Sequence, residues 1–139
     1  MIVGVGVDLV EVQRIQSILD RHGEAFLLRI LRPGEIEYCR THSRPAAHVA
    51  ARFAAKEAIS KAFGTGIGAQ LGWHDVEILR NENGCPAVQL HGQALGLLAR
   101  KGAARVLITL THTAQHAMAV AILDSEAPPS GGAIESRSH

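Results

Sequence analysis

The chain has 139 residues, of which 47% are hydrophobic and 19% are charged, and its formal net charge is +1. This balance predicts one globular domain with a buried core and excludes a mostly disordered chain, and the near-neutral charge argues against a partner nucleic acid. With only Cys39 and Cys85, no apolar run of about 18 residues and no basic leader, we expect a cytoplasmic protein with neither a disulfide framework nor a membrane span.

Residues 2–10 alternate in the manner of a β-strand. One face carries Val3, Val5, Val7 and Leu9, and the other carries Gly4, Gly6 and Asp8. Two glycines on one face allow another element to approach closely. The next segment, 11–22, is predicted as an amphipathic helix whose apolar stripe is Val12, Ile15, Ile18 and Leu19.

Short helices are predicted at 25–31 and 33–40, and the strongest helical pattern covers 46–63. Strands follow at 74–79, 87–91, 106–112 and 117–123, with a helix at 92–101 between the second and the third. Because strands and helices do not alternate regularly, the fold class is α+β, with a small antiparallel-rich sheet against a long buried helix. We expect one domain over 1–124 and a disordered tail over 125–139, where Pro, Gly and Ser are frequent.

The helix predicted at 46–63 is apolar nearly all round, yet it carries Arg52, Lys56, Glu57 and Lys61. Arg52 and Lys56 are four apart and share one side, and Glu57 and Lys61 share a second side. On spacing alone, Glu57 and Lys61 are best interpreted as a simple ion pair along the helix. The alternative is a cationic strip that binds phosphate, beside a carboxylate that holds a metal ion.

Asp8 has two interpretations that the sequence leaves open. An aspartate at the end of a strand often caps the helix that follows. Alternatively, Asp8 and Glu57 could hold Mg²⁺ together with phosphate oxygens, provided that the strand packs beside the helix. The glycines at 4 and 6 do not form a dinucleotide fingerprint, because no strand precedes them and the third glycine is absent. His112, alone on an apolar strand, is more often a structural residue.

Four segments together resemble a known family: 4–11 (GVGVDLVE), 52–58 (RFAAKEA), 61–67 (KAFGTGI) and 111–113 (THT). They are similar to the bacterial holo-[acyl-carrier-protein] synthases, the short type of 4′-phosphopantetheinyl transferase. The resemblance extends over about residues 1–124, with the motifs in family order. One departure is visible, because Thr109 stands where the late motif of the family has serine.

The resemblance implies a 4′-phosphopantetheinyl transferase-like fold and an enzyme of fatty acid biosynthesis. Such an enzyme transfers phosphopantetheine from coenzyme A to a serine of apo acyl carrier protein and releases adenosine 3′,5′-bisphosphate. Mg²⁺ would be held by Asp8 and Glu57, which with Lys61 and His112 would form the catalytic set. Arg52 would lie near the 3′-phosphate, and the implied contacts to coenzyme A come from Arg52, Lys56, Lys61, Gly64, Thr65, Gly66, His112 and Thr113.

The family also implies a homotrimer with active sites at subunit interfaces. The base that activates the serine stays open between Glu57, a water on the metal and a carboxylate of the carrier protein. Arg14 and Arg21, one heptad apart on the first helix, would dock the acidic carrier protein, although a solvated stripe is the alternative. The competing function is a noncatalytic module that binds coenzyme A or a nucleotide, and such a module would not need the pair Asp8 and Glu57.

Overall fold

The computed structural model of the chain describes residues 1–127, so most of the tail expected at 125–139 lies outside the described residues. Two antiparallel sheets are present within this part. One has the order β1-β5-β4, and the other pairs β2 with β3. The strands are β1 (Ile2–Glu11), β2 (Val76–Arg80), β3 (Pro86–Leu90), β4 (Arg105–His112) and β5 (His116–Asp124).

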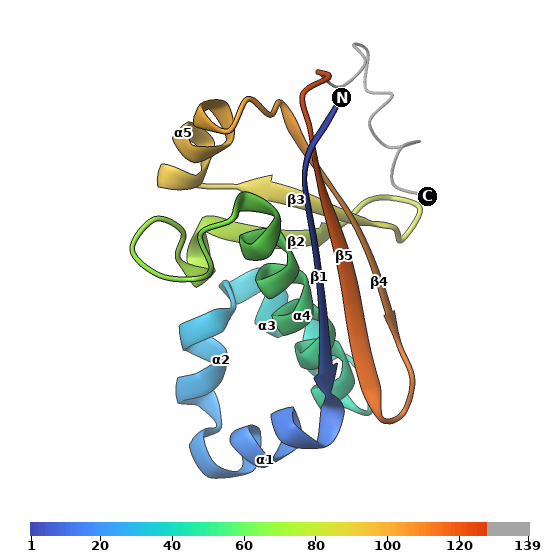
Figure 1. Cartoon of the computed structure of the whole chain (residues 1–139). Coiled ribbons are helices and arrows are strands. Elements are labelled where there is room, and N and C mark those ends of the chain that lie inside the picture. The colour runs from blue at the N-terminus through green and yellow to red at the C-terminus, as the bar shows by residue number, and fades with distance from the viewer. Residues whose placement is uncertain (128–139) are drawn as a thin grey trace.

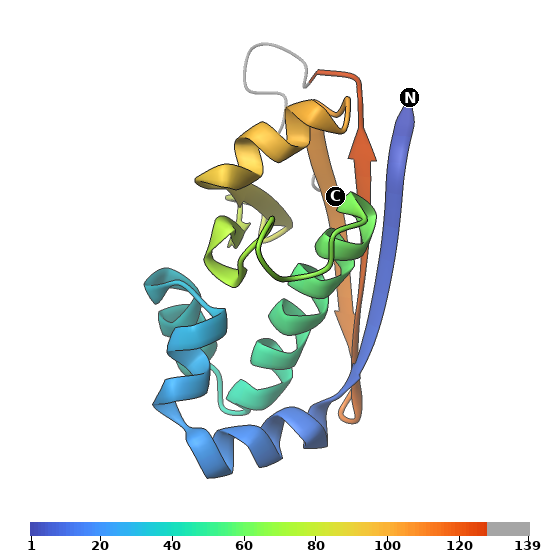
Figure 2. The same ribbon diagram turned by 60° about the vertical axis from the view of Figure 1, so that its left-hand side comes forward.

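The helices are α1 (Val12–His22), α2 (Glu24–Ile30), α3 (Pro33–Arg40), α4 (Pro45–Phe63) and α5 (Gln93–Arg100), and η1 (Trp73–Asp75) is a short 3₁₀ helix. Helix α4 runs along one face of the sheet of long strands, while α1, α2 and α3 form an arm beside it (Figures 1 and 2). No helix among residues 1–127 is long and apolar enough to cross a bilayer. The α+β class predicted from the sequence is confirmed.

Close packing between β1 and α4 depends on the two glycines of the strand. A Cβ on Gly6 would lie 2.0 Å from the carbonyl oxygen of Ala58, and one on Gly4 would lie 2.4 Å from that of Ala62. Neither distance is possible for a real side chain, so only glycine lets the helix approach the strand this closely. The close approach predicted for this face of the strand is therefore confirmed.

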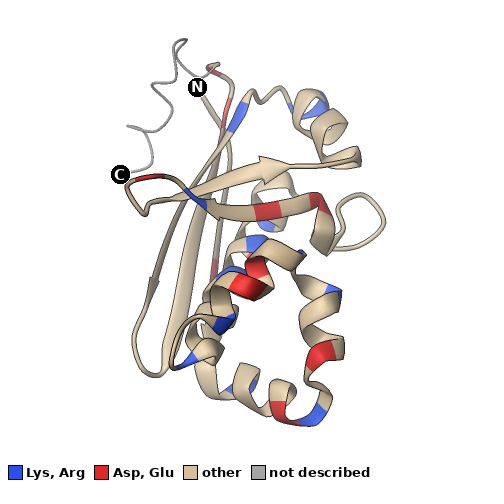
Figure 3. Cartoon of the chain, turned by 180° about the vertical axis from the view of Figure 1, so that it is seen from behind, with Lys and Arg blue, Asp and Glu red and all other residues tan. Residues whose placement is uncertain are grey.

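The other face of the same sheet is uncovered. Val5, Val7 and Leu9 are 61%, 51% and 61% exposed, and Met118 of β5 is also exposed. The register Val7↔Val120↔Thr109 places Thr109 on this outer face as well. Seen from behind, the long strands carry few charged residues over most of their length (Figure 3). The domain thus leaves one apolar sheet face open to the surroundings.

One predicted boundary is wrong. The strand expected from His74 begins at Val76, because Trp73–Asp75 forms the turn η1 instead. The backbone N–H of Asp75 donates to the carbonyl of Gly72, and the carboxylate of Asp75 accepts the N–H of Gly72 at 2.8 Å. These two bonds stabilise a turn where the alternating pattern indicates a strand.

Candidate functional site

Asp8 of β1 lies close enough to Glu57 of α4 for its charge to act on that carboxyl, although the sequence separates them by almost fifty residues. Lys61 Nζ donates to Asp8 Oδ1 at 2.9 Å and to the carbonyl of Val7 at 3.1 Å. Burial and the charge of Asp8 raise the pKa of Glu57, while Lys61 and Arg14 oppose that rise. We call Asp8, Arg14, Glu57 and Lys61 the carboxylate cluster.

The geometry changes both simple interpretations of these residues. Asp8 lies within β1, three residues before Glu11, which stands at the N-cap of α1, so Asp8 does not cap that helix. In the part of the chain that the structure describes, the ion pair of Lys61 crosses to Asp8 rather than running along α4 to Glu57. The i, i+4 pair favoured by spacing alone is therefore replaced by a link between strand and helix.

The carboxylate cluster fits a magnesium ion by its donor chemistry. Asp8 and Glu57 supply hard oxygen donors, and Mg²⁺ commonly takes one or two carboxylates together with phosphate oxygens and water. The charge of Asp8 already disfavours the ionised form of Glu57, and a cation between the two would relieve this repulsion. Residues 1–127 contain no group of three or more His, Cys, Asp and Glu side chains that could hold a metal, so water molecules, and phosphate oxygens when substrate is bound, would complete the coordination.

Lys56 does not face solvent, and its expected contact with coenzyme A is wrong. Its side chain is 0% exposed. Its ammonium donates to the carbonyl of Ile30 at 2.7 Å, to Glu35 Oε1 at 2.8 Å and to the carbonyl of Trp73 at 3.0 Å. Because an ammonium has three hydrogens to donate, these partners leave none for a phosphate.

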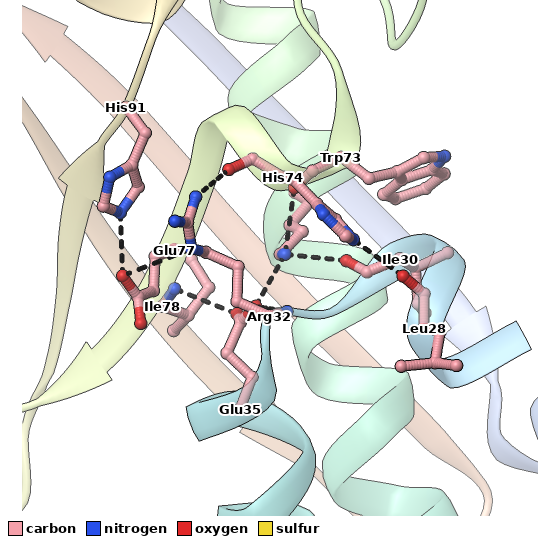
Figure 4. A network of polar contacts seen from close by, with 10 residues as sticks. Leu28, Ile30, Arg32, Glu35, Trp73, His74, Glu77, Ile78 and His91 are labelled. Atoms are coloured by element: carbon pink, nitrogen blue, oxygen red, sulfur yellow. Dashed lines mark hydrogen bonds and ion pairs between the residues drawn. The ribbon is translucent and has the colours of Figure 1, made fainter. Parts of the chain in front are cut away.

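Glu35, the acidic partner of Lys56, was missed by the sequence reasoning. It is buried at the start of α3, where Oε1 also accepts the N–H of Arg32 and Oε2 accepts the N–H of Ile78. Figure 4 shows this network between α3, the turn η1 and β2. An acid in the first turn of a helix is ordinarily a favourable surface residue, so no local signal distinguishes Glu35.

Arg52 is likewise buried, at 1% exposure. Its guanidinium lies 4.3 Å from the centre of the Tyr38 ring, and Arg80 lies 5.3 Å from the same centre. Among the described residues, Nε and Nη1 of Arg52 have no hydrogen-bond partner. Buried donors without partners are costly. An anion bound beside Arg52 would accept the hydrogen bonds that no described residue accepts from Nε and Nη1.

His112 belongs to a histidine cluster, which we define as His42, His48 and His112. The rings of His42 and His48 stack with centroids 3.6 Å apart, and His48 and His112 meet edge to face at 5.3 Å. Burial lowers the pKa of His48 to about 4, and the charges of His42, His112, Arg52 and Arg80 add to this effect. No sequence pattern indicates these contacts, because His42 follows α3, His48 lies in α4 and His112 ends β4.

The two clusters lie at opposite edges of the sheet. The register His112↔Ala117↔Val10 places His112 on β4, whereas Asp8 lies on β1 with β5 between them. Two strand spacings amount to about 10 Å. Within one chain, therefore, the predicted catalytic residues Lys61 and His112 belong to different clusters.

The remaining predicted residues lie on exposed turns and helices. Gly64 and Gly66 have φ values of 81° and 68°, and nothing lies within 4 Å of a Cβ built on either, so the loop after Lys61 is open on one side. Thr113 caps the turn between β4 and β5, since its hydroxyl accepts the N–H groups of Gln115 and His116. Arg14 and Arg21 are exposed on α1.

An open hollow of about 560 Å³ lies elsewhere, between the start of α1, the start of α4 and the turn that joins β4 to β5. Its lining includes Gln13, Gln16, Arg44 and His116. None of the site residues predicted from the sequence lines it, so this hollow does not coincide with either cluster.

Comparison with known proteins defines the class. The family model described as the 4′-phosphopantetheinyl transferase superfamily matches residues 4–121, and the chain belongs to this superfamily. Its relatives include the holo-[acyl-carrier-protein] synthase of Chlorobaculum parvum, 46% identical over 119 residues that make up 86% of this chain and 96% of the relative. That of Desulforudis audaxviator is 47% identical over 122 residues, covering 88% and 92%.

Solved structures of the same kind share the fold. The holo-[acyl-carrier-protein] synthase of Neisseria meningitidis superposes with a TM-score of 0.83 at 31% identity, covering 89% of this chain and 99% of that one. The Helicobacter pylori protein, solved in complex with coenzyme A, gives a TM-score of 0.77 at 30% identity over 86% and 99%. The resemblance found in the sequence motifs is thereby confirmed over nearly the whole length of these proteins.

Proposed function

We propose that the chain transfers the 4′-phosphopantetheine group of coenzyme A to a serine of apo acyl carrier protein, releasing adenosine 3′,5′-bisphosphate, as a step that supports fatty acid biosynthesis in the cytoplasm. The observation that carries the proposal is the similarity, at 46% and 47% identity, to holo-[acyl-carrier-protein] synthases that align over almost their full length. The adjacency of Asp8, Glu57 and Lys61 supports it.

Asp8 and Glu57 are the residues that would hold Mg²⁺, and the bound ion would supply neutralising charge at the pyrophosphate of coenzyme A. Lys61 lies on the neighbouring turn of α4 with half of its side chain exposed, so its ammonium is free to turn from Asp8 toward a phosphate oxygen. Positive charge at that place stabilises the negative charge that develops in phosphoryl transfer. The open glycine loop after Lys61 leaves room for the nucleotide.

The phosphates would also meet the histidine cluster, contributed by a second copy of the chain. Arg52, with two unsatisfied nitrogens, and His112 are the residues proposed to contact them, with Thr113 nearby. Because one chain holds the two clusters at opposite sheet edges, we propose that a site containing both forms between copies.

We therefore include a homotrimer in the proposal, and the exposed apolar face of the sheet supports it. Helix α4 does not supply the surface for such an association, because it buries nearly all of its apolar residues within its own chain. The uncovered side chains belong instead to the outer sheet face, at Val5, Val7 and Leu9. Burying such a face between copies is favourable at roughly 25 cal/mol per Å².

The carrier protein is proposed to dock on α1 through Arg14 and Arg21. Arg14 lies near enough to Glu57 to lower its pKa, so a partner bound there would present its serine close to the carboxylate cluster. We also propose that residues 1–124 form one domain of the synthase type. In support, Asp124 at the end of β5 pairs with Arg105 of β4 at 2.7 Å.

The test is to incubate the purified protein with apo carrier protein, coenzyme A and Mg²⁺ and to weigh the carrier protein by mass spectrometry. A gain of one phosphopantetheine group that requires Mg²⁺ is expected. Tight binding of coenzyme A without any gain in carrier mass would instead indicate the noncatalytic module.

A further inference from the structure

Helix α4 is held on two sides at the level of Glu57. Successive residues of an α-helix are 100° apart, so Lys56 and Ala58 point about 200° apart, on nearly opposite sides of the helix, with Glu57 between them. On the side of Ala58, the backbone of α4 lies so close to Gly6 of β1 that no side chain fits between them. Lys56 is bound on the other side to Ile30, Glu35 and Trp73.

The contacts of Lys56 join segments that are far apart in the sequence. The carbonyl of Ile30 ends α2, Glu35 belongs to the first turn of α3, and Trp73 begins η1. Figure 4 shows Ile30, Glu35 and Trp73 converging on one ammonium group. Both members of the pair of Lys56 and Glu35 are 0% exposed, so removal of one partner leaves the charge of the other buried and unpaired.

We propose that Lys56 is a positioning residue that keeps the carboxylate of Glu57 beside that of Asp8. This inference rests on the proposed function, in which these two carboxylates hold the metal ion. Without the ammonium, α4 would lose its polar anchor on the side away from Gly6, and it could turn or shift so that Glu57 moves away from Asp8. Lys56 acts through the helix and does not touch substrate.

A test of this role must separate positioning from simple stabilisation. Arg32→Met is the matched control for Lys56→Met. Arg32 also ties two segments of the same network, since Nη1 donates to the carbonyl of His74 at 2.6 Å and Nε lies 3.8 Å from Glu77 Oε1. Neither of these two contacts is made to α4. Loss of the Arg32 side chain should therefore weaken the network without releasing Glu57.

The measurement is Mn²⁺ binding to the whole protein, followed by the electron paramagnetic resonance signal of free Mn²⁺ at a temperature well below unfolding. Lys56→Met should weaken Mn²⁺ binding by about tenfold, the usual effect of losing an outer support of a metal ligand. Arg32→Met should bind Mn²⁺ as the wild type does. Equal affinities of Lys56→Met and wild type would overturn the inference while leaving the proposed function intact.

Two further measurements cover the other outcomes. If Lys56→Met does not fold, the pair of changes Lys56→Met and Glu35→Gln removes both buried charges, and this double variant should show the same weakened Mn²⁺ binding. If the wild type binds no Mn²⁺, the proposed metal site fails, and crystal structures then test the positioning role alone. An unchanged separation of Asp8 and Glu57 in Lys56→Met would overturn it, and a larger separation would support it.

Discussion

Two charged stripes lie side by side on α4, and one is buried whereas the other reaches the surface. Arg52 and Lys56 are buried, and Lys56 is bound to Glu35 in the interior. Glu57 and Lys61, one residue further round the helix, reach the surface beside Asp8. The spacing of four residues shows which side chains share a side, but it does not show which side faces the core. A rotation of 100° separates a structural ion pair from a candidate catalytic one.

The largest expected effect comes from the surface stripe and its partner. Asp8→Ala or Glu57→Ala should lower Mg²⁺-dependent transfer by about 10³-fold, since the metal-bound charge contributes several kcal/mol to the transition state. The midpoint of urea unfolding should stay near that of the wild type, because neither carboxylate is fully buried. Turnover is measured by carrier-protein mass. Full activity in both single variants would reject the metal site.

The buried stripe should show the reverse behaviour. Glu35→Ala leaves the ammonium of Lys56 buried without an anion, which typically costs about 3–5 kcal/mol of folding free energy. Urea denaturation measures the loss, and Glu37→Ala, on the exposed side of α3, is the control that should change little. A loss for Glu35→Ala no larger than that for Glu37→Ala would contradict the structural role of the pair.

The dependence of the free energy of unfolding on pH tests the buried side of α4 at His48, which lies one helical turn before Arg52. The pKa of His48 is lowered from 6.5 to about 4, so between these values the folded chain binds fewer protons than the unfolded chain. The free energy of unfolding contributed by His48 is therefore fully present above pH 6.5 and decreases as the pH falls toward 4.

As the pH falls from 6.5 toward 4, the free energy of unfolding should decrease less for His48→Phe than for the wild type. Urea midpoints at several pH values measure it. His22→Gln, on α1 away from the histidine cluster, should follow the wild-type curve. Parallel curves for wild type and His48→Phe would show that His48 does not titrate as the geometry requires.

The smallest effect is expected at the docking helix. Arg14→Ala with Arg21→Ala should raise the KM for carrier protein by a few-fold at low salt and leave the KM for coenzyme A nearly unchanged, because exposed charges act mainly on encounter. High salt should narrow the difference from wild type. Arg100→Ala on α5 is the control. Unchanged carrier-protein kinetics in the double variant at low salt would move the docking surface elsewhere.

Much of the fold could be predicted because it depends on local patterns. The alternation around Gly4 and Gly6 predicted both the strand and the close approach of another element, and Pro45–Phe63 agrees closely with the predicted helix 46–63. The strand boundary predicted at His74 is the exception. There the carboxylate of Asp75 accepts a hydrogen bond from the N–H of Gly72, and this turn competes with strand pairing.

The candidate site was only partly accessible to the same reasoning. Asp8, Glu57 and Lys61 could be brought together because each lies in a motif with a recognisable chemistry. Glu35, His42, His48 and Arg80 could not, since their roles come from contacts between elements that the sequence does not place. The family resemblance implies that Lys56 contacts coenzyme A, and the burial that opposes this contact depends on the position of α3, which the sequence does not place.

The separation of the two clusters has a genetic consequence. If copies associate as proposed, each chain lends its carboxylate cluster to one site and its histidine cluster to another. A chain defective at Lys61 alone and a chain defective at His112 alone could then restore some activity when mixed, because some interfaces would receive the intact half of each. A chain defective at both positions would instead inactivate the two sites to which it contributes in any trimer that contains it. Such a chain would act as a dominant inhibitor of the wild type.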